Sequence, residues 1–265
     1  MTQLLVESAD GTPISCESYG DGHALLIVSG ALFAAERWLN VVKLLSDKYC
    51  VHLLDRRGRG KSGDHAPYTP EREVEDILAV LNAIPGPIDL VGHSSGAILA
   101  LGAAAHGHSK LERLVVYEPP VFFAEPDLIA PDLPERLEAL LAAGKRDLAV
   151  ETFLREGPRN SDDNLRAMKA GPAWLGMVTG LGHTVPYDAR VQRAFTADPA
   201  QLARVQIPTL MLVGGASPAR MRAGAETVAS RLPNARLAEL PEQQHMAMLQ
   251  APALLAAAIT DFLAP

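Results

Sequence analysis

The spacing of apolar residues divides the chain into three parts. Up to about residue 118, short apolar runs typical of strands alternate with longer runs in helical spacing. From about 119 to 205 only the helical spacing is found, and after 206 the alternation resumes. Strand–helix alternation produces a mostly parallel sheet with helices on both faces. The pattern therefore predicts an α/β fold with a helical segment inserted between two strands of one sheet.

The predicted elements set the boundaries of these parts. An antiparallel hairpin is expected around the turn Asp10-Gly11, and continuous apolar runs after it are typical of strands buried on both faces. Strands are predicted at 4–8, 14–19, 24–28, 50–54, 88–91, 114–117, 209–213 and 235–240. Helices are predicted at 34–45, 70–83, 95–106, 134–143, 147–155, 161–170, 218–231 and 252–262. Thr69 is expected to cap the helix that begins at Pro70. The chain is thus divided into a core, residues 1–118 and 206–265, and a helical cap, residues 119–205.

Length, charge and cysteine content narrow the class of protein. The 265 residues suit one large domain, and a net charge of −7 leaves no basic surplus for binding nucleic acid. Cys16 and Cys50 are too few for a disulfide framework and are not spaced as metal ligands. The start of the chain does not resemble a signal peptide, and no run of about 18 apolar residues could span a membrane. We expect a cytoplasmic monomer or homodimer whose partner is a small molecule.

The glycine-rich stretch Gly58–Gly63 matches the dinucleotide-binding pattern G-x-G-x-x-G and follows a predicted strand. That site needs a helix that starts at the glycines and directs its N-terminus at the pyrophosphate. Here Asp64–Pro67 intervene, and the helix begins only near Pro70. A nucleotide site is therefore not expected.

The strongest catalytic signal is the pentapeptide G-H-S-S-G at 92–96. It follows the predicted strand at 88–91 and precedes a helix rich in small residues. In such a motif a sharp strand-to-helix turn holds the serine, and the flanking glycines let the two backbones approach closely. Ser94 is the candidate nucleophile, and a serine that only caps the helix is the alternative.

The candidate general base is His245, in the loop between the last predicted strand and the last helix. An imidazole there can reach back to Ser94. The other histidines are less well placed. His93 adjoins the nucleophile at a variable position of the motif, and His183 lies in the insertion, where it could line a pocket or be structural.

These features together resemble the α/β-hydrolase superfamily over nearly the whole chain. The resemblance is carried by the elbow GHSSG, the upstream loop DRRGRGKS at 55–62, and His245 followed by an apolar helix. It implies an α/β-hydrolase fold with a helical cap inserted after strand six, and a nucleophile–acid–base order along the chain. A serine nucleophile argues against haloalkane dehalogenase or epoxide hydrolase activity, since those relatives use an aspartate there.

The acid of the triad is absent from its usual place. In most relatives it follows the penultimate strand in a stretch resembling V-G-x-x-D-P, where this chain has VGGASP at 213–218, and Ser217-Pro218 is typical of a helix cap. Some members place the acid at the end of strand six, where this chain has Glu118. A carboxylate at the end of a buried strand is costly without a partner. Glu118 is the favoured acid; the alternatives are a Glu118 that only anchors the cap, an acid from the cap such as Asp188, or a dyad without an acid.

The resemblance also implies an oxyanion hole built from two backbone N–H groups, one of them from Ser95. The second comes from the loop after strand three, where relatives carry His-Gly and this chain has Ser29-Gly30, with Ala31 as the expected donor. The amide survives this change. The change removes the side chain that supports the rigidity of this loop in the relatives.

The sequence therefore predicts a capped serine hydrolase that cleaves an ester, lactone or related acyl bond of a small apolar molecule through an acyl-enzyme, with no cofactor or metal. Thioester or carbon–carbon hydrolysis, perhydrolysis and cofactor-free oxygenation stay open, as does a ligand-binding protein with a degraded triad. The expected pocket walls are His93, Phe122, Phe123, Trp174, His183 and Met246, with Leu175, Met177 and Tyr187 as further candidates. Each cap side chain could equally belong to the core of the cap.

Overall fold

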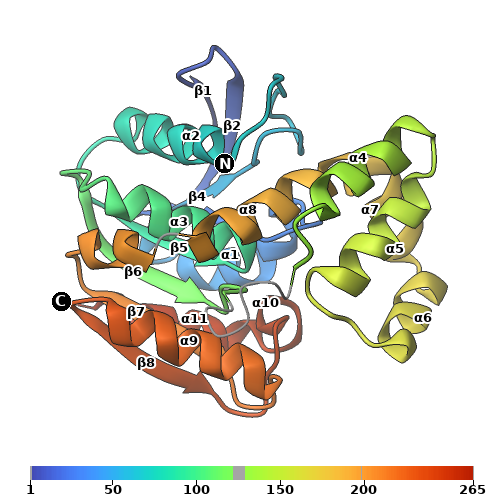
Figure 1. Cartoon of the computed structure of the whole chain (residues 1–265). Helices are drawn as coiled ribbons and strands as arrows, with labels where there is room; N and C mark the ends of the chain where they lie inside the picture. Colours follow the sequence, from blue (N-terminus) through green and yellow to red (C-terminus); the bar gives the residue numbers. More distant parts are fainter. Residues whose placement is uncertain (1, 122–128, 198, 265) are drawn as a thin grey trace.

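The computed structural model describes residues 2–121, 129–197 and 199–264, and one eight-stranded sheet runs through them (Figure 1). Its order is β1-β2-β4-β3-β5-β6-β7-β8. The strands are β1 (Thr2–Glu7), β2 (Pro13–Tyr19), β3 (His23–Val28), β4 (Tyr49–Leu54), β5 (Ile88–His93), β6 (Leu111–Tyr117), β7 (Thr209–Gly214) and β8 (Ala235–Leu240). β2 pairs antiparallel with β1 and β4, and the other pairings are parallel. The predicted hairpin and mostly parallel sheet are confirmed.

The parallel strands bring distant loops together at one edge of the sheet. β3 lies between β4 and β5, so the strand order reverses there, and α/β sheets bind ligands at the carboxyl ends of strands beside such a reversal. The segments that follow β3, β5, β6, β7 and β8 all begin at this edge. They carry Ala31, Ser94, Glu118, Ser217 and His245.

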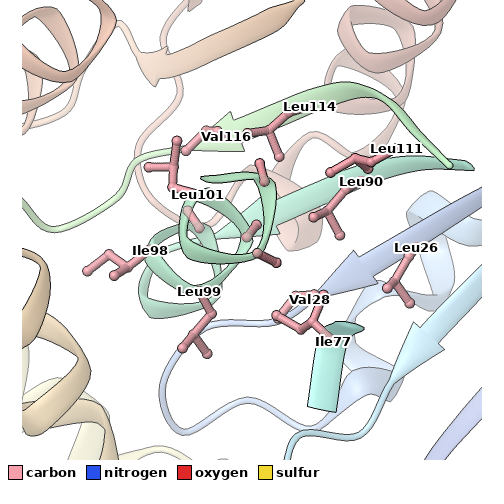
Figure 2. Close-up of a cluster of buried hydrophobic side chains, with 14 of the residues drawn as sticks. Leu26, Val28, Ile77, Leu90, Ile98, Leu99, Leu101, Leu111, Leu114 and Val116 are labelled. Atoms are coloured by element: carbon pink, nitrogen blue, oxygen red, sulfur yellow. The ribbon is translucent and has the colours of Figure 1, made fainter. Parts of the chain in front are cut away.

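Helices cover both faces of the sheet, and each face has its own hydrophobic core. The helices of the core part are η1 (Ala35–Trp38), α1 (Leu39–Leu45), α2 (Pro70–Ala83), α3 (Ser95–Ala105), α9 (Ala219–Arg231), α10 (Ala247–Gln250) and α11 (Pro252–Leu263). α2, α3 and α9 contribute to the core on one face, and α1, α10 and α11 to the other. Figure 2 shows the first of these, where Leu99 and Leu101 of α3 share a cluster with Leu90 of β5. β5 and β7 are buried along their whole length, which accounts for their continuous apolar sequence.

The chain between β6 and β7 is helical, as the pattern predicts. It contains α4 (Leu133–Ala142), α5 (Arg146–Glu156), α6 (Asp162–Ala170), α7 (Ala173–Leu181), η2 (Gly182–Thr184), α8 (Val185–Ala197) and η3 (Pro199–Arg204). In Figure 1, α4 to α7 form a group at one side of the sheet, while α8 runs back toward α3. This group has its own apolar core around Leu137, Phe153 and Trp174. The boundaries of the cap at 119 and 205 stay a prediction. Among the described helices, none combines the length and the apolar character that a membrane span requires.

Several local predictions are wrong in detail. The helix predicted at 34–45 begins with the tighter turn η1 before α1, and 3₁₀ turns are common at helix starts. Thr69 precedes α2 but its hydroxyl makes no capping hydrogen bond. Ser217 is not a helix cap, because its hydroxyl donates to Glu118 instead. α7 and α8 are missing from the predicted helices, since Gly176 and Gly180 weaken the helical signal of α7.

Candidate active site

Ser94 lies on the turn between β5 and α3. Its backbone has φ 56° and ψ −127°, and a residue other than glycine held at positive φ stores strain of the kind found at functional sites. A Cβ atom on Gly96 would lie 2.4 Å from the backbone oxygens of Val28 and Ser29. Only glycine at 96 therefore lets α3 approach the end of β3 this closely. The strand–turn–helix context predicted for the elbow is present.

A hydrogen bond joins His245 to Glu118. Nδ1 of His245 lies 2.7 Å from Oε2 of Glu118. Since a carboxylate only accepts, Nδ1 carries the proton, and Nε2 of a neutral His245 keeps a free lone pair. Glu118 is fully buried, whereas the His245 side chain is 36% exposed. This tautomer is the one that a base acting on a serine hydroxyl requires.

The second carboxylate oxygen of Glu118 is held from the end of β7. Oε1 accepts the Gly214 N–H at 2.8 Å and the Ser217 hydroxyl at 2.5 Å. Burial by itself raises the pKa of Glu118, but the hydrogen bonds it accepts outweigh burial and hold this pKa below its ordinary value. Glu118 is therefore ionised at neutral pH. Ser217 is a contact that the sequence analysis missed; its place after β7, the strand next to β6, is the signal that points to it.

Two buried side chains hold the backbone around His245. Nε2 of His93 donates to the His245 carbonyl at 3.0 Å, and the Tyr117 hydroxyl donates to the Gln244 carbonyl. Because Nε2 of His93 carries the proton, its Nδ1 does not, and this buried nitrogen has no hydrogen-bond partner among the described residues. Burial, together with the nearby His245, lowers the pKa of His93 well below its ordinary value, so the ring stays neutral. His93 is 1% exposed and supports the His245 loop rather than lining an open pocket.

No hydrogen bond joins Ser94 to His245 among the described residues. Within the described residues the hydrogen bonds of His245 go to Glu118 and His93, and none reaches the Ser94 hydroxyl. Catalytic hydrogen bonds of this kind often reach their final length only in the complex with substrate. The site thus consists of a strained serine and a histidine–carboxylate pair, which the neighbour of the serine, His93, contacts through the His245 carbonyl.

The predicted oxyanion donors are the N–H groups of Ser95 and Ala31. Ser95 is the first residue of α3, so its N–H has no acceptor within the helix. In the part of the chain that the structure describes, neither N–H donates to another protein group. A Cβ atom on Gly30 would lie 2.7 Å from Cβ of Ser94, so the loop that carries Ala31 runs directly against the serine. Both amides are therefore available near Ser94.

Asp188, the alternative acid from the cap, makes its described contacts with Ser95 and two arginines, not with His245. Its Oδ1 accepts the Ser95 hydroxyl and the Arg56 guanidinium, each at 2.9 Å. Its Oδ2 accepts from Arg59 at 2.8 Å, and all four side chains are buried. The sequence analysis missed this cluster because Arg56 and Asp188 are 132 positions apart and no local pattern connects them.

The predicted pocket residues have different surroundings. Phe122 and Phe123 lie outside the described residues. Trp174 is buried in the core of the cap, and His183 donates to a backbone carbonyl of the loop after β4 at 2.8 Å. Met246 is half-buried against the core that contains α11. A hollow of about 380 Å³ between α2, α3 and α8 includes none of the predicted site residues.

One group of potential metal ligands is found within the described residues. It consists of His23, Asp89 and Glu112, whose ligand atoms all lie within 4.8 Å of one another. His23 and the buried Asp89 form an ion pair with 3.1 Å between Nε2 and Oδ2. His23 begins β3, and Asp89 and Glu112 are the second residues of β5 and β6, so the group lies at the sheet edge opposite to Ser94.

Comparison with known proteins identifies the family. The Alpha/beta hydrolase family matches residues 25–258. The crystal structure of an α/β hydrolase from Sphaerobacter thermophilus DSM 20745 is 41% identical, covers 98% of this chain and 99% of that chain, and has a TM-score of 0.90. The pimeloyl-[acyl-carrier protein] methyl ester esterase of Aeromonas hydrophila subsp. hydrophila is 25% identical over 90% of this chain and 94% of the esterase. The N-formylmaleamate deformylase of Pseudomonas putida is 40% identical over 105 residues, which span 38% of this chain and 39% of the deformylase.

The chain belongs to the α/β-hydrolase family, as its elbow, upstream loop and terminal histidine predict. The predicted fold class is confirmed with it. The chain is an enzyme of this class, with esterases among its relatives.

Proposed function

We propose that this enzyme hydrolyses an ester, lactone or related acyl bond of a small apolar molecule, with Ser94 as nucleophile, His245 as general base and Glu118 as the acid of the triad. The observation that carries the proposal is the 2.7 Å hydrogen bond from His245 Nδ1 to the buried Glu118. It supplies a carboxylate to a histidine in the order serine–acid–histidine along the chain. The strained Ser94 on its strand-to-helix turn supports the role of nucleophile.

In the proposed reaction, Nε2 of His245 takes the Ser94 hydroxyl proton while Oγ attacks the carbonyl carbon. The carbonyl oxygen becomes an oxyanion, which accepts from the N–H groups of Ser95 and Ala31; one such donor contributes roughly 3–4 kcal/mol. The bond to the leaving oxygen then breaks, and the imidazolium gives its proton to that oxygen. Water attacks the acyl-enzyme in the same way, losing a proton to His245, and the acid is released as Ser94 recovers its proton.

Glu118 has two tasks in this scheme. Its negative charge stabilises the imidazolium that forms when His245 takes the proton. Its hydrogen bond also holds Nδ1 as the protonated nitrogen, so that Nε2 faces the reaction. The hydrogen bonds from Ser217 and Gly214 favour the ionised carboxylate that both tasks need.

The comparisons support acyl chemistry without fixing the substrate. The Aeromonas relative is a methyl ester esterase, and the Pseudomonas relative, a deformylase, aligns over only part of its length. We propose a small-molecule ester as the substrate class, and a monomer or homodimer acting without a nucleic-acid or membrane partner.

The test is hydrolysis of p-nitrophenyl butyrate by the wild type and by Glu118→Gln. We expect kcat/KM to fall by a factor of about 10³ to 10⁴, because the neutral amide no longer stabilises the imidazolium or fixes its tautomer. Glu112→Gln is the matched control, since it makes the same chemical change at an exposed position of β6, the strand that Glu118 follows. It should keep near-wild-type activity.

Two outcomes would contradict the proposal in different ways. If Glu118→Gln stays fully active, Glu118 is only a structural anchor. If the wild type is inactive and a fluorophosphonate probe fails to label Ser94, the chain is a binding protein on a hydrolase scaffold.

A further inference from the structure

One nitrogen of Arg56 contacts both loops of the proposed oxyanion hole. Arg56 lies in the loop after β4, and its Nη1 donates to the Ser95 hydroxyl at 3.0 Å and to the Ser29 carbonyl at 3.4 Å. Ser95 carries one proposed oxyanion donor, and Ser29 precedes the other, Ala31, by two residues. The same Nη1 also donates to Asp188 of α8 at 2.9 Å. A single side chain thus connects the elbow, the oxyanion loop and the insertion.

The Ser95 side chain is fixed in direction by these contacts. Its hydroxyl accepts from Arg56 and donates to Asp188, so its donor is fully used, and the residue is completely buried. Because Ser95 is the first residue of α3, holding its side chain also restrains its backbone N–H. The N–H direction matters, since an oxyanion donor acts only within hydrogen-bond distance of the developing charge.

The oxyanion loop has no comparable support from its own side chain. The hydroxyl of Ser29 is buried and has no hydrogen-bond partner among the described residues. Ser29 stands where the family resemblance leads one to expect a histidine that stiffens the loop. The contact from Arg56 to the Ser29 backbone therefore supplies a restraint that the Ser29 side chain does not.

The position of Arg56 is itself fixed by buried charges. Glu73 of α2 accepts two hydrogen bonds from Arg56, at 2.6 and 2.7 Å, and Asp188 also accepts from Arg59. Two arginines and two carboxylates balance, so the cluster carries no net charge. Burial alone raises the pKa of Glu73 and of Asp188, but the arginines outweigh it and lower both. A buried ion cluster is expensive to desolvate and is weak evidence for stability, which favours a role in positioning.

We propose that Arg56 and Asp188 are positioning residues of the oxyanion hole, so that helix α8 of the insertion completes the site. The inference rests on the proposed function, because it assigns the Ser95 and Ala31 amides to an oxyanion. Neither residue touches the substrate in this scheme. They act through Ser95 and Ser29.

The test compares Ser95→Ala and Asp188→Asn with the wild type, with rates normalised to the sites labelled by a fluorophosphonate. Ser95→Ala keeps the backbone N–H and removes only the hydroxyl that orients it. For both variants we expect kcat to fall about 10- to 100-fold while KM changes by less than about threefold, because a misplaced donor acts mainly on the transition state. The Ki of a butyl boronic acid, which forms a tetrahedral adduct on a serine, should rise by the same factor as kcat/KM falls. The double variant should lose less than the product of the two single losses, because both changes remove the same contact between Ser95 and Asp188.

Asp76→Asn is the matched control. Asp76 is also buried, and it accepts from Arg57 of the same loop at 2.7 and 2.8 Å without contact to Ser95 or Ser29. This variant should lose thermal stability but keep its kcat per labelled site and its boronic acid Ki.

The inference is wrong if Ser95→Ala and Asp188→Asn lower the melting temperature while kcat and the boronic acid Ki per labelled site stay at wild-type values. It is also wrong if Asp76→Asn lowers kcat as much as Asp188→Asn does, since the effect would then follow any broken buried pair. A wild type that neither turns over ester nor is labelled at Ser94 refutes the proposed function instead, and the two failures are thereby distinguished.

Discussion

Glu118 and Ser217 lie side by side at the ends of neighbouring strands. The hydroxyl of Ser217 is 2.5 Å from one oxygen of Glu118, and the other oxygen is 2.7 Å from His245 Nδ1. The chain therefore has a carboxylate after β6 and a hydroxyl after β7, where the resemblance would have led one to expect the acid after β7. A side chain that follows β6 and one that follows β7 can therefore reach nearly the same position beside His245.

This geometry predicts that the acid can be moved from β6 to β7. Glu118→Ala should inactivate the enzyme, and adding Ser217→Asp should restore kcat/KM at least about tenfold over that single variant, because the new carboxylate occupies the vacated region. The measurement is p-nitrophenyl butyrate hydrolysis by the two variants. Glu118→Ala/Ser217→Asn, which has the shape without the charge, should show no recovery. Equal rates for the Asp and Asn double variants would argue against an interchangeable position.

The residues that the sequence identified are those with a local motif. Ser94 stands in a pentapeptide with a defined turn, and His245 stands in a fixed place between the last strand and the last helix. Glu118 stands in no motif of its own, and it became the favoured acid because the family resemblance places the acid of some members at the end of strand six. Arg56 stands in the upstream loop and Asp188 was an alternative acid, but nothing in the sequence indicated that the two side chains contact each other, because this contact depends on how α8 packs against the core. Contacts of this kind can be recognised only once the packing of the insertion against the core is known.

At the scale of elements, the loop from β8 to α10 is held by the two strands beneath the site. β5 supplies His93 and β6 supplies Tyr117, and each donates to a backbone carbonyl of this loop. Neither side chain touches His245 Nε2 through a hydrogen bond, so both fix its position only through the backbone. Side chains of two buried strands thereby position the backbone of His245, although the imidazole itself is partly exposed.

We therefore expect Tyr117→Phe to lower kcat about tenfold, because a loop that shifts by a fraction of an ångström misplaces the base. Stability should fall by only about 1 kcal/mol, the net contribution of one hydrogen bond. Both are measured, by ester hydrolysis and by urea unfolding. Tyr19→Phe serves as the control, since Tyr19 bonds to Glu17 within β2, outside the site. Unchanged kcat in Tyr117→Phe would mean that the hydrogen bond from Tyr117 does not position His245.

The elements themselves were predictable to different degrees. Strands buried on both faces, such as β5 and β7, have continuous apolar sequences, and the sequence located them well. α7 and α8 were missed because their helical character depends on packing. α7 contains two glycines. α8 places Asp188 on its buried face, where an amphipathic helix normally carries the apolar residues by which it is recognised. Tertiary contacts with Arg56 and Arg59 compensate for that charge, and a local pattern does not contain them.

At the scale of the whole molecule, charge and burial are coupled across the core and the insertion. Buried carboxylates at 73, 118 and 188 all have a pKa held below the ordinary value by the donors around them. The buried His93 also has a lowered pKa, but for a histidine this favours the neutral form and not the charged one. The stability of the fold should therefore depend on pH in separate windows, and the window that involves His93 should lie above that of the buried carboxylates.

His93 allows this to be tested, because its folded-state pKa is well below 6.5 while the unfolded chain titrates near 6.5. Above that pH both states are neutral, and His93 contributes nothing to the pH dependence. As pH falls through 6.5 the unfolded state takes up a proton that the folded state does not, so stability is lost, by at most about 1.4 kcal/mol between pH 7.5 and 5.5, the value for a folded state that stays neutral throughout. His93→Gln removes this contribution, and the difference in unfolding free energy between wild type and variant should change by that amount over the same range. Urea unfolding at each pH measures this free energy, and the pH window lies above the range in which Glu118 titrates.

His65→Gln, a change at an exposed site, is the control, and its unfolding free energy should vary with pH as that of the wild type does. Parallel wild-type and His93→Gln curves would mean that His93 takes up a proton in the folded state, and its neutral role in holding the His245 loop would then be wrong.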